Sequence, residues 1–191
     1  MRAAASIARS GRLVYVIGPS GSGKDSIIAY ARARLADDPD APVFVRRHIT
    51  RPAESGGEDH IPISPSDFEQ ACIAGRFALA WRGNGHGYGV ETEIDLSLGA
   101  GRHAVLNGSR AYLPEAAARY PGLMPVLIRI DPAVLRERLA GRGRESAAEI
   151  EARVRRAMAF EQVAHRDLVE IANDGPLVEA GEAFLALLRS L

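Results

Sequence analysis

The residues best suited to chemistry form a glycine-rich run, Gly-Pro-Ser-Gly-Ser-Gly-Lys, at positions 18–24. This run fits the first seven positions of the phosphate-binding pattern G-x-x-x-x-G-K-[ST]. Glycines let backbone N–H groups turn toward phosphate oxygens, and the N-terminus of a following helix attracts anions. The alternative is a tight turn that binds nothing. We favour an ATP site made by Gly18, Pro19, Ser20, Gly21, Ser22, Gly23, Lys24, Asp25 and Ser26.

Lys24 and Asp25 would give this loop its chemistry. A lysine at this position reaches the β- and γ-phosphates, so Lys24 is predicted to be catalytic. Asp25 stands where Ser or Thr usually binds Mg²⁺, and a carboxylate beside a triphosphate is repelled unless a cation lies between them. Asp25 is therefore a candidate Mg²⁺ ligand. The alternative is that Asp25 only stabilises the first helical turn. Ser26, about 100° further round the helix, is a weaker candidate.

Arginines crowd residues 138–156, where Gly141 and Gly143 interrupt a helical pattern around Arg142. Arginine flanked by glycine suits a cover that closes over phosphates and neutralises the charge that develops during phosphoryl transfer. For Arg155 we favour the alternative, a solvated helix with Glu–Arg pairs. The stretch predicts an arginine-rich lid with catalytic roles for Arg138, Arg142 and Arg153.

A second basic cluster, Arg-Arg-His-Ile-Thr-Arg at 46–51, follows a strand expected at 43–45. In open α/β sheets, ligands bind beyond the carboxyl ends of strands. Two basic clusters and a phosphate loop together predict a donor and an acceptor phosphate site. No general base stands out, and a phosphate acceptor needs none because its oxygen is already an anionic nucleophile.

The elements that must position these groups alternate between strand and helix at both ends of the chain. Such alternation predicts an α/β fold, in which a parallel sheet of the P-loop NTPase kind is flanked by helices. Apolar runs predict strands at 13–17, 43–45, 104–106, 124–130 and 168–171. Helices are expected at 24–35, at 109–119, from Pro132 onward and at 180–188.

The alternation breaks between about 46 and 100. We interpret this stretch as an inserted acceptor-binding subdomain within one domain of 1–191, whose core is 12–45 and 101–191. Residues 51–65, rich in Pro, Gly and charge, predict an irregular loop. Further elements are expected as a helix at 66–74 capped by Ser66, strands at 77–81 and 88–90 around a turn at 83–85, and a helix at 93–98.

Composition narrows the functional class. The 24 Lys and Arg residues balance 24 Asp and Glu residues, which argues against a general binder of nucleic acid or membrane surfaces. The lone Cys72 excludes an internal disulfide, and no Cys/His spacing indicates zinc. Residues 1–11 are too short and too weakly apolar for a signal peptide, so a cytoplasmic protein is expected. The oligomeric state stays open, a homodimer included.

These residues resemble guanylate kinases over nearly the whole chain. The similar segments are 18–24, Thr50-Arg51-Pro52 with Gly57-Glu58, Gly75-x-Phe77 to Trp81, Tyr88-Gly89-Val90 and the arginine stretch 138–144. Three positions depart from that family. Where guanylate kinases have a guanine-reading glutamate, this chain has Leu79 or Ala80, depending on the alignment. Where they have a serine near the base and a phosphate-binding tyrosine, this chain has Arg47 and His60.

The departures resemble a narrower family, the ribose 1,5-bisphosphate phosphokinases of phosphonate breakdown. The matching motifs are Gly-Lys-Asp-Ser at 23–26, Ile-Thr-Arg-Pro at 49–52, Gly-Gly-Glu-x-His at 56–60, Tyr-Gly-Val at 88–90, Asn-Gly-Ser-Arg at 107–110 and Arg-Gly-Arg-Glu at 142–145. The resemblance implies that Mg²⁺ and ATP phosphorylate ribose 1,5-bisphosphate to 5-phosphoribosyl diphosphate.

The substitutions fit that reaction, because a purine edge needs a carboxylate and a phosphate dianion needs arginine. We expect Arg47 to hold the distal phosphate, and Arg51 and His60 to hold the acceptor phosphate. The resemblance also implies substrate contacts from Glu58, Tyr88, Asn107 and Arg110. Two rival interpretations are a GMP-type kinase, which the missing glutamate disfavours, and a non-catalytic binding module, which has no reason to keep Lys24 and the arginines.

Overall fold

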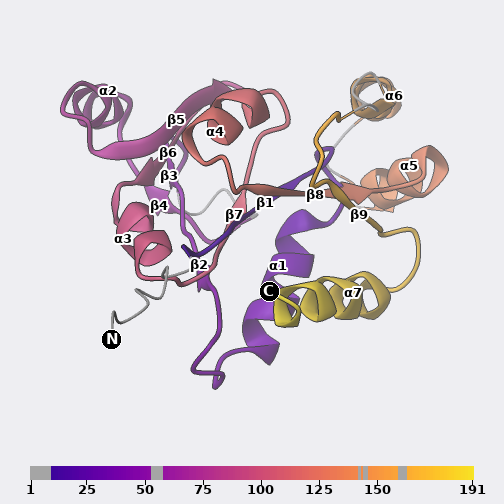
Figure 1. Ribbon diagram of the computed structural model, residues 1–191. Helices are drawn as coiled ribbons and strands as arrows, with labels where there is room; N and C mark the ends of the chain where they lie inside the picture. The colour runs from indigo at the N-terminus through magenta and orange to yellow at the C-terminus, as the bar shows by residue number, and fades with distance from the viewer. Residues whose placement is uncertain (1–9, 53–57, 142, 144–145, 159–162) are drawn as a thin grey trace, which may run out of the picture.

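The computed structural model describes residues 10–52, 58–141, 143, 146–158 and 163–191 (Figure 1). A five-stranded parallel sheet forms its centre, in the order β2-β7-β1-β8-β9. All five residues of β1 are buried, as expected for a strand covered on both faces of a parallel sheet. The strands are β1 (Leu13–Ile17), β2 (Val43–Phe44), β7 (Ala104–Asn107), β8 (Met124–Arg129) and β9 (Val169–Ala172).

Helices cover both faces of this sheet. Side chains along β1 alternate between two hydrophobic clusters, with Tyr15 in one and Val16 in the other. On one face lie α1 (Lys24–Arg34) and α7 (Leu177–Arg189), which contribute Ile27 and Phe184. On the other face lie α3 (Glu93–Gly99), α4 (Leu113–Arg119) and the second sheet, so the two sheets share one hydrophobic cluster (Figure 1).

The second sheet has four strands in the order β4-β3-β6-β5. Its hairpin between β5 and β6 turns at Asn84 and Gly85, both with positive φ (49° and 79°), which suits a tight hairpin turn. Helix α2 (Pro65–Ile73) packs on this sheet through the buried Phe68. The strands are β3 (His48–Ile49), β4 (Ile61–Pro62), β5 (Phe77–Gly83) and β6 (His86–Glu91).

Two further helices, α5 (Pro132–Gly141) and α6 (Ala147–Met158), stand beyond the carboxyl end of β8 (Figure 1). They pack against each other through a small cluster of their own, formed by Leu135, Leu139, Ile150 and Val154. The pair therefore has a hydrophobic core distinct from the two clusters that cover the central sheet.

The predicted fold class is confirmed, with differences at short elements. Ser66 is not the cap of α2: Ser64 is, because its hydroxyl accepts a hydrogen bond from the Asp67 N–H at 3.1 Å. The expected loop 51–65 contains β4, while 53–57 lie outside the described residues. No helix in the described ranges is long and apolar enough to cross a membrane.

Candidate active site

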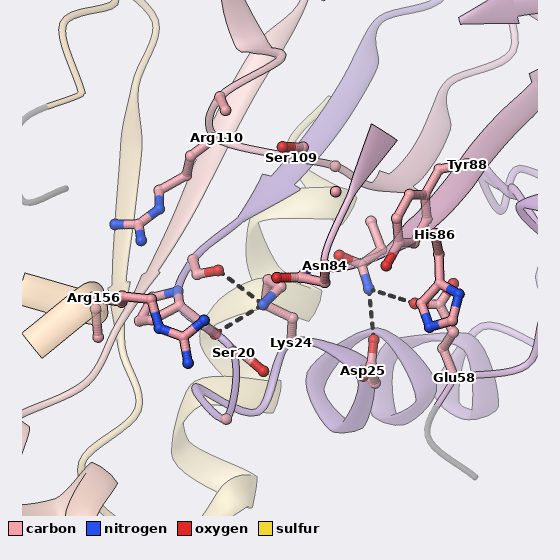
Figure 2. A pocket seen from close by; sticks show the side chains of 18 of the residues that line it. Ser20, Lys24, Asp25, Glu58, Asn84, His86, Tyr88, Ser109, Arg110 and Arg156 are labelled. Carbon is pink, nitrogen blue, oxygen red and sulfur yellow. Dashed lines mark hydrogen bonds between the residues drawn. The ribbon is translucent and has the colours of Figure 1, made fainter. Parts of the chain in front are cut away.

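One cleft of about 740 Å³ collects most of the predicted functional residues. Its walls come from the phosphate loop at 18–25, the second sheet, the loop after β7 and helix α6. Figure 2 shows Ser20, Arg110 and Arg156 toward one end and Glu58, His86 and Tyr88 toward the other. The cleft therefore has two ends. After the predicted ligands, we call the end at the phosphate loop the donor end and the end at the second sheet the acceptor end.

At the donor end, the phosphate loop depends on glycine backbone conformations. Gly21 and Gly23 have φ of 95° and 89°, which side chains other than glycine rarely adopt. Lys24 folds back over the loop and its Nζ donates hydrogen bonds to the carbonyls of Gly18 and Pro19, both at 2.9 Å. Burial in the loop lowers the pKa of Lys24 to about 8. The Lys24 ammonium therefore lies against the phosphate loop, at the wall of the cleft.

Asn173, a residue that the sequence interpretation missed, supports the loop from behind. This buried side chain follows β9, and its Nδ2 donates to the Ser22 carbonyl at 2.6 Å. A Cβ at Gly23 would lie 2.4 Å from that nitrogen. Asn173 is itself held by its N–H, which donates to the Arg129 carbonyl at 2.9 Å. No motif signals it, because the contact joins segments 151 residues apart.

Asp25 faces a second carboxylate across the cleft. The Nδ2 of Asn107 donates to Asp25 Oδ1 at 2.6 Å and to Glu58 Oε2 at 3.2 Å (Figure 2). One amide group therefore bridges the donor end to the acceptor end. Desolvation, followed by the negative charge of Glu58, raises the pKa of Asp25. Ser26, the alternative candidate, does not line the cleft.

Arg47 lines the acceptor end and is only 7% exposed. Its Nε donates to Glu58 Oε1 at 2.8 Å, and its Nη2 pairs with Glu58 Oε2. The guanidinium lies over the Tyr88 ring, 4.8 Å from its centre, and Tyr88 stacks on Trp81. Arg47, which aligns with the serine near the base in guanylate kinases, is thus held in the cleft by a carboxylate and by aromatic rings.

Arg51 also lines the cleft, and its state differs from that of Arg47. Its Nε and Nη2 are shielded from solvent, and neither has a hydrogen-bond partner among the described residues. Buried, unpaired donors on a charged group are costly, so such a group suits an anionic ligand.

His60 lies behind the wall of the cleft and does not line it. Its ring nitrogens are within hydrogen-bond distance of two backbone carbonyls, Nδ1 of Glu58 O (3.0 Å) and Nε2 of Arg51 O (3.1 Å). The His60 side chain is therefore not placed to contact an acceptor phosphate directly, as the sequence had led us to expect. His60 instead fixes the backbone that carries Glu58 and Arg51.

The lid arginines separate into two groups. Arg153 of α6 lines the cleft, and its Nη2 donates to Ser20 Oγ at 2.7 Å, which joins α6 to the phosphate loop. Arg138 does not line the cleft, because its Nη2 donates to the Gly175 carbonyl at 2.9 Å. Arg142 lies outside the described residues. Arg156, three positions after Arg153 and hence on the same helical face, lines the cleft and was not singled out from the sequence.

Other lining residues were also missed at the acceptor end. Asn84 and His86 belong to the β5–β6 hairpin, and His86 shares a strand face with the predicted Tyr88 because the two are two residues apart. Ser109, from the loop after β7, also lines the cleft, next to the predicted Arg110. The period-two pattern of β6 was the available signal for His86.

A phosphate loop, a cationic acceptor end and arginines from a helical pair, all on one cleft, define a P-loop kinase with a guanylate-kinase-like fold. The crystal structure of guanylate kinase from Anaplasma phagocytophilum superposes with a TM-score of 0.62 over 95% of this chain and 86% of that one, at 16% identity. At that identity the likeness shows the fold alone.

Sequence comparison places the chain within that class, although no protein-family model matches it. Ribose 1,5-bisphosphate phosphokinase PhnN of Thiobacillus denitrificans is 51% identical over 178 residues, 93% of each chain. The protein of the same name from Desulfomicrobium baculatum is 49% identical, over 93% of this chain and 94% of its own. The chain belongs to the ribose 1,5-bisphosphate phosphokinase family.

Proposed function

We propose that the protein transfers the γ-phosphoryl group of ATP to the 1-phosphate of ribose 1,5-bisphosphate, giving 5-phosphoribosyl diphosphate and ADP. The observation that carries this proposal is Arg51, a cleft-lining residue whose Nε and Nη2 are shielded from solvent and have no hydrogen-bond partner among the described residues. A phosphate loop and an arginine suited to an anionic ligand, both on one cleft, are what a kinase with a phosphate acceptor needs. The activity named for the two bacterial relatives supports the same reaction.

At the acceptor end, Arg51 is the proposed partner of the 1-phosphate and Arg47 the proposed partner of the 5-phosphate. Glu58 occupies the Nε and Nη2 positions of Arg47, which leaves Nη1 for a ligand. Arginine suits this task because its planar group can pair with a carboxylate and a phosphate at once. Tyr88 and Asn107 line the same end, and Arg110 the other, as further proposed contacts.

A purine in this pocket would lack the carboxylate with which guanylate kinases read the polar edge of guanine. Leu79, one of the two positions aligned with the guanine-reading glutamate, is 1% exposed and packs in the shared hydrophobic cluster. Glu58 is engaged by Arg47 and Asn107. The cleft therefore favours a sugar with two phosphates over GMP.

Mg²⁺ fits the residues between the two ends. Asp25 and Glu58 share one amide donor, and the charge of Glu58 helps to raise the pKa of Asp25, a repulsion that a cation would relieve. Mg²⁺ is commonly held by one or two carboxylates together with nucleotide phosphates. We propose Asp25 as its protein ligand, with Glu58 nearby. When bound, the ion supplies positive charge to the β- and γ-phosphates.

The chain's own groups carry the transfer. Lys24 would leave the two loop carbonyls and bind the β- and γ-phosphates. An oxygen of the 1-phosphate, oriented by Arg51, attacks the γ-phosphorus; the new P–O bond forms as the bond to the bridging oxygen breaks, and ADP leaves with that electron pair. Arg153 and Arg156, from α6, neutralise the charge on the transferred group. No side chain has to remove a proton.

This assignment gives each part of the chain a task. The core (12–45 and 101–191) holds ATP, the inserted part at about 46–100 holds the acceptor, and the lid at about 138–156 closes over the phosphates. A cytoplasmic location is part of this proposal, because the enzyme needs ATP as its donor.

A panel of acceptors in a coupled ADP-release assay tests the proposal. Ribose 1,5-bisphosphate should give the highest kcat/KM, with ribose 5-phosphate and GMP at least about a hundredfold lower, because each lacks one of the two phosphates. Faster turnover of GMP than of the bisphosphate would replace the proposal with a GMP-type kinase.

A further inference from the structure

His86 is a cleft residue without a role in the reaction described so far. It opens β6, pairs across the hairpin with Gly83, and lies on the same strand face as Tyr88. Figure 2 shows its ring at the Glu58 end of the cleft, away from Arg110 and Arg156. His86 therefore lies at the acceptor end.

The hydrogen bonds around His86 fix its tautomer. Its Nδ1 is 2.9 Å from the Thr50 carbonyl, and a carbonyl only accepts, so Nδ1 carries a proton and donates. When Nδ1 alone carries the ring proton, Nε2 is an acceptor, and Nε2 has no partner among the described residues. His86, which lines the cleft, thus keeps one ring acceptor without a partner among the described residues.

Thr50 also sets the position of the ring. Its N–H donates to the Gly87 carbonyl at 3.1 Å, and its Oγ1 accepts from the Gly87 N–H at 2.8 Å. Three bonds from one residue hold the strand next to His86 and the ring itself. Thr50 directly precedes Arg51, so His86 is tied to the backbone beside the proposed acceptor-phosphate site.

The chemistry of the acceptor end makes this nitrogen unusual. Arg47 and Arg51 are donors, which match the phosphate oxygens of a bisphosphorylated sugar. The sugar also brings two hydroxyl groups, at C2 and C3, and hydroxyls need acceptors. The carboxylate of Glu58 is already engaged by Arg47 and Asn107. His86 Nε2 is an acceptor that no group among the described residues engages.

We infer that His86 Nε2 accepts a hydrogen bond from a ribose hydroxyl, at C2 or C3, and thereby makes this enzyme selective for the intact sugar between the two phosphates. The inference rests on the proposed function. It assigns recognition of a sugar hydroxyl to His86, while Arg47 and Arg51 recognise the phosphates at the two ends of the sugar.

Deoxy analogues test this assignment. Ribose 1,5-bisphosphate and its 2-deoxy and 3-deoxy forms are compared with the wild type, His86→Leu and His86→Gln. For the wild type, one deoxy form should lose about tenfold in kcat/KM. His86→Leu should lose about as much on the intact substrate and no longer distinguish that deoxy form, while KM for ATP stays unchanged. His86→Gln, which keeps an acceptor oxygen, should restore part of the discrimination.

The matched control is His165→Leu, which removes a histidine outside the cleft and should keep the wild-type discrimination. The inference is overturned if the wild type uses both deoxy forms as well as the intact sugar, a comparison that needs no variant to fold. It is also overturned if His86→Leu keeps the wild-type ratio. A wild type that uses no ribose bisphosphate and turns over GMP would instead reject the proposed function, and the inference with it.

Discussion

The two ends of the cleft are built in different ways. At the donor end, a continuous segment of seven residues supplies backbone N–H groups, one ammonium and the start of a helix. At the acceptor end, the groups come from both flanks of β3, from the segment before β4, and from β5, β6 and the end of β7. Arg47, Glu58, Tyr88 and Asn107 contact one another there before any ligand binds.

The difference indicates where specificity is set. A loop of backbone donors suits any nucleotide phosphate, and its geometry is fixed by glycine and by Asn173. The acceptor end places Arg47 through Glu58 and Tyr88, so a change of one side chain alters what the pocket accepts. The following predictions test whether the two ends can be damaged separately.

The largest effect is expected at Lys24. Lys24→Met removes the charge that faces the transferred phosphates, so kcat should fall about a thousandfold. Binding of ribose 1,5-bisphosphate, measured by calorimetry without nucleotide, should stay within about twofold of the wild type. An equal loss of bisphosphate binding would show that the ends are not separate.

Arg47 provides the converse experiment. Arg47→Ala removes the proposed 5-phosphate partner and leaves Glu58 without its ion pair, so KM for the bisphosphate should rise about a hundredfold with KM for ATP unchanged. The matched control is Arg46→Ala, because Arg46 is exposed and pairs with Asp59 at 2.9 Å outside the cleft. An unchanged KM in Arg47→Ala would refute its assignment.

The two lid arginines refine the donor end. Arg153→Ala should lower kcat about thirtyfold, because this side chain lies in the cleft against Ser20. Arg138→Ala should lower it no more than about threefold, because its exposed guanidinium bonds to the Gly175 carbonyl. Steady-state measurement of kcat for the two purified variants tests this difference. A larger loss in Arg138→Ala than in Arg153→Ala would show that Arg138 acts in the site.

The smallest expected effect is a shift in the pKa of Lys24, measured by titration. Lys24 is the only lysine in the sequence, so reductive methylation with ¹³C gives one side-chain signal. That signal should titrate with a pKa of about 8 in the free protein, below the ordinary 10.5, because burial disfavours the ammonium. Added ATP should raise the pKa. A value near 10.5 without ATP would contradict the buried placement.

The same shift predicts how stability depends on pH. Between pH 8 and 10.5 the unfolded chain binds more protons at Lys24 than the folded one, so this group makes the free energy of unfolding rise with pH in that window. In Lys24→Met that rise is absent. The Tm of the variant relative to the wild type should therefore be highest near pH 7 and fall by a few degrees toward pH 10.

The donor end could be predicted from sequence because its information is local. Gly18 to Lys24 are contiguous, and the motif states which atoms face the phosphates. The buried strands were equally clear, since continuous apolar runs mark β1 and β8.

The acceptor end was harder to predict. Arg47 and Glu58 were named as separate contacts, and nothing in the sequence signals that they pair with each other. His60 has the right spacing for the loop, but burial directs its ring toward backbone carbonyls. Such pairings depend on strands such as β3, which is two residues long and leaves no periodic pattern.

Phosphorus NMR of the wild-type protein with Mg²⁺, ATP and ribose 1,5-bisphosphate tests the central claim. That claim is that the enzyme transfers the γ-phosphoryl group of ATP to the 1-phosphate of the sugar. The account predicts that the signals of ATP and of the 1-phosphate decline, while a pair of diphosphate doublets distinct from those of ADP appears and the 5-phosphate keeps its own signal. An inert mixture, in a sample that rapidly converts GMP to GDP, would contradict it.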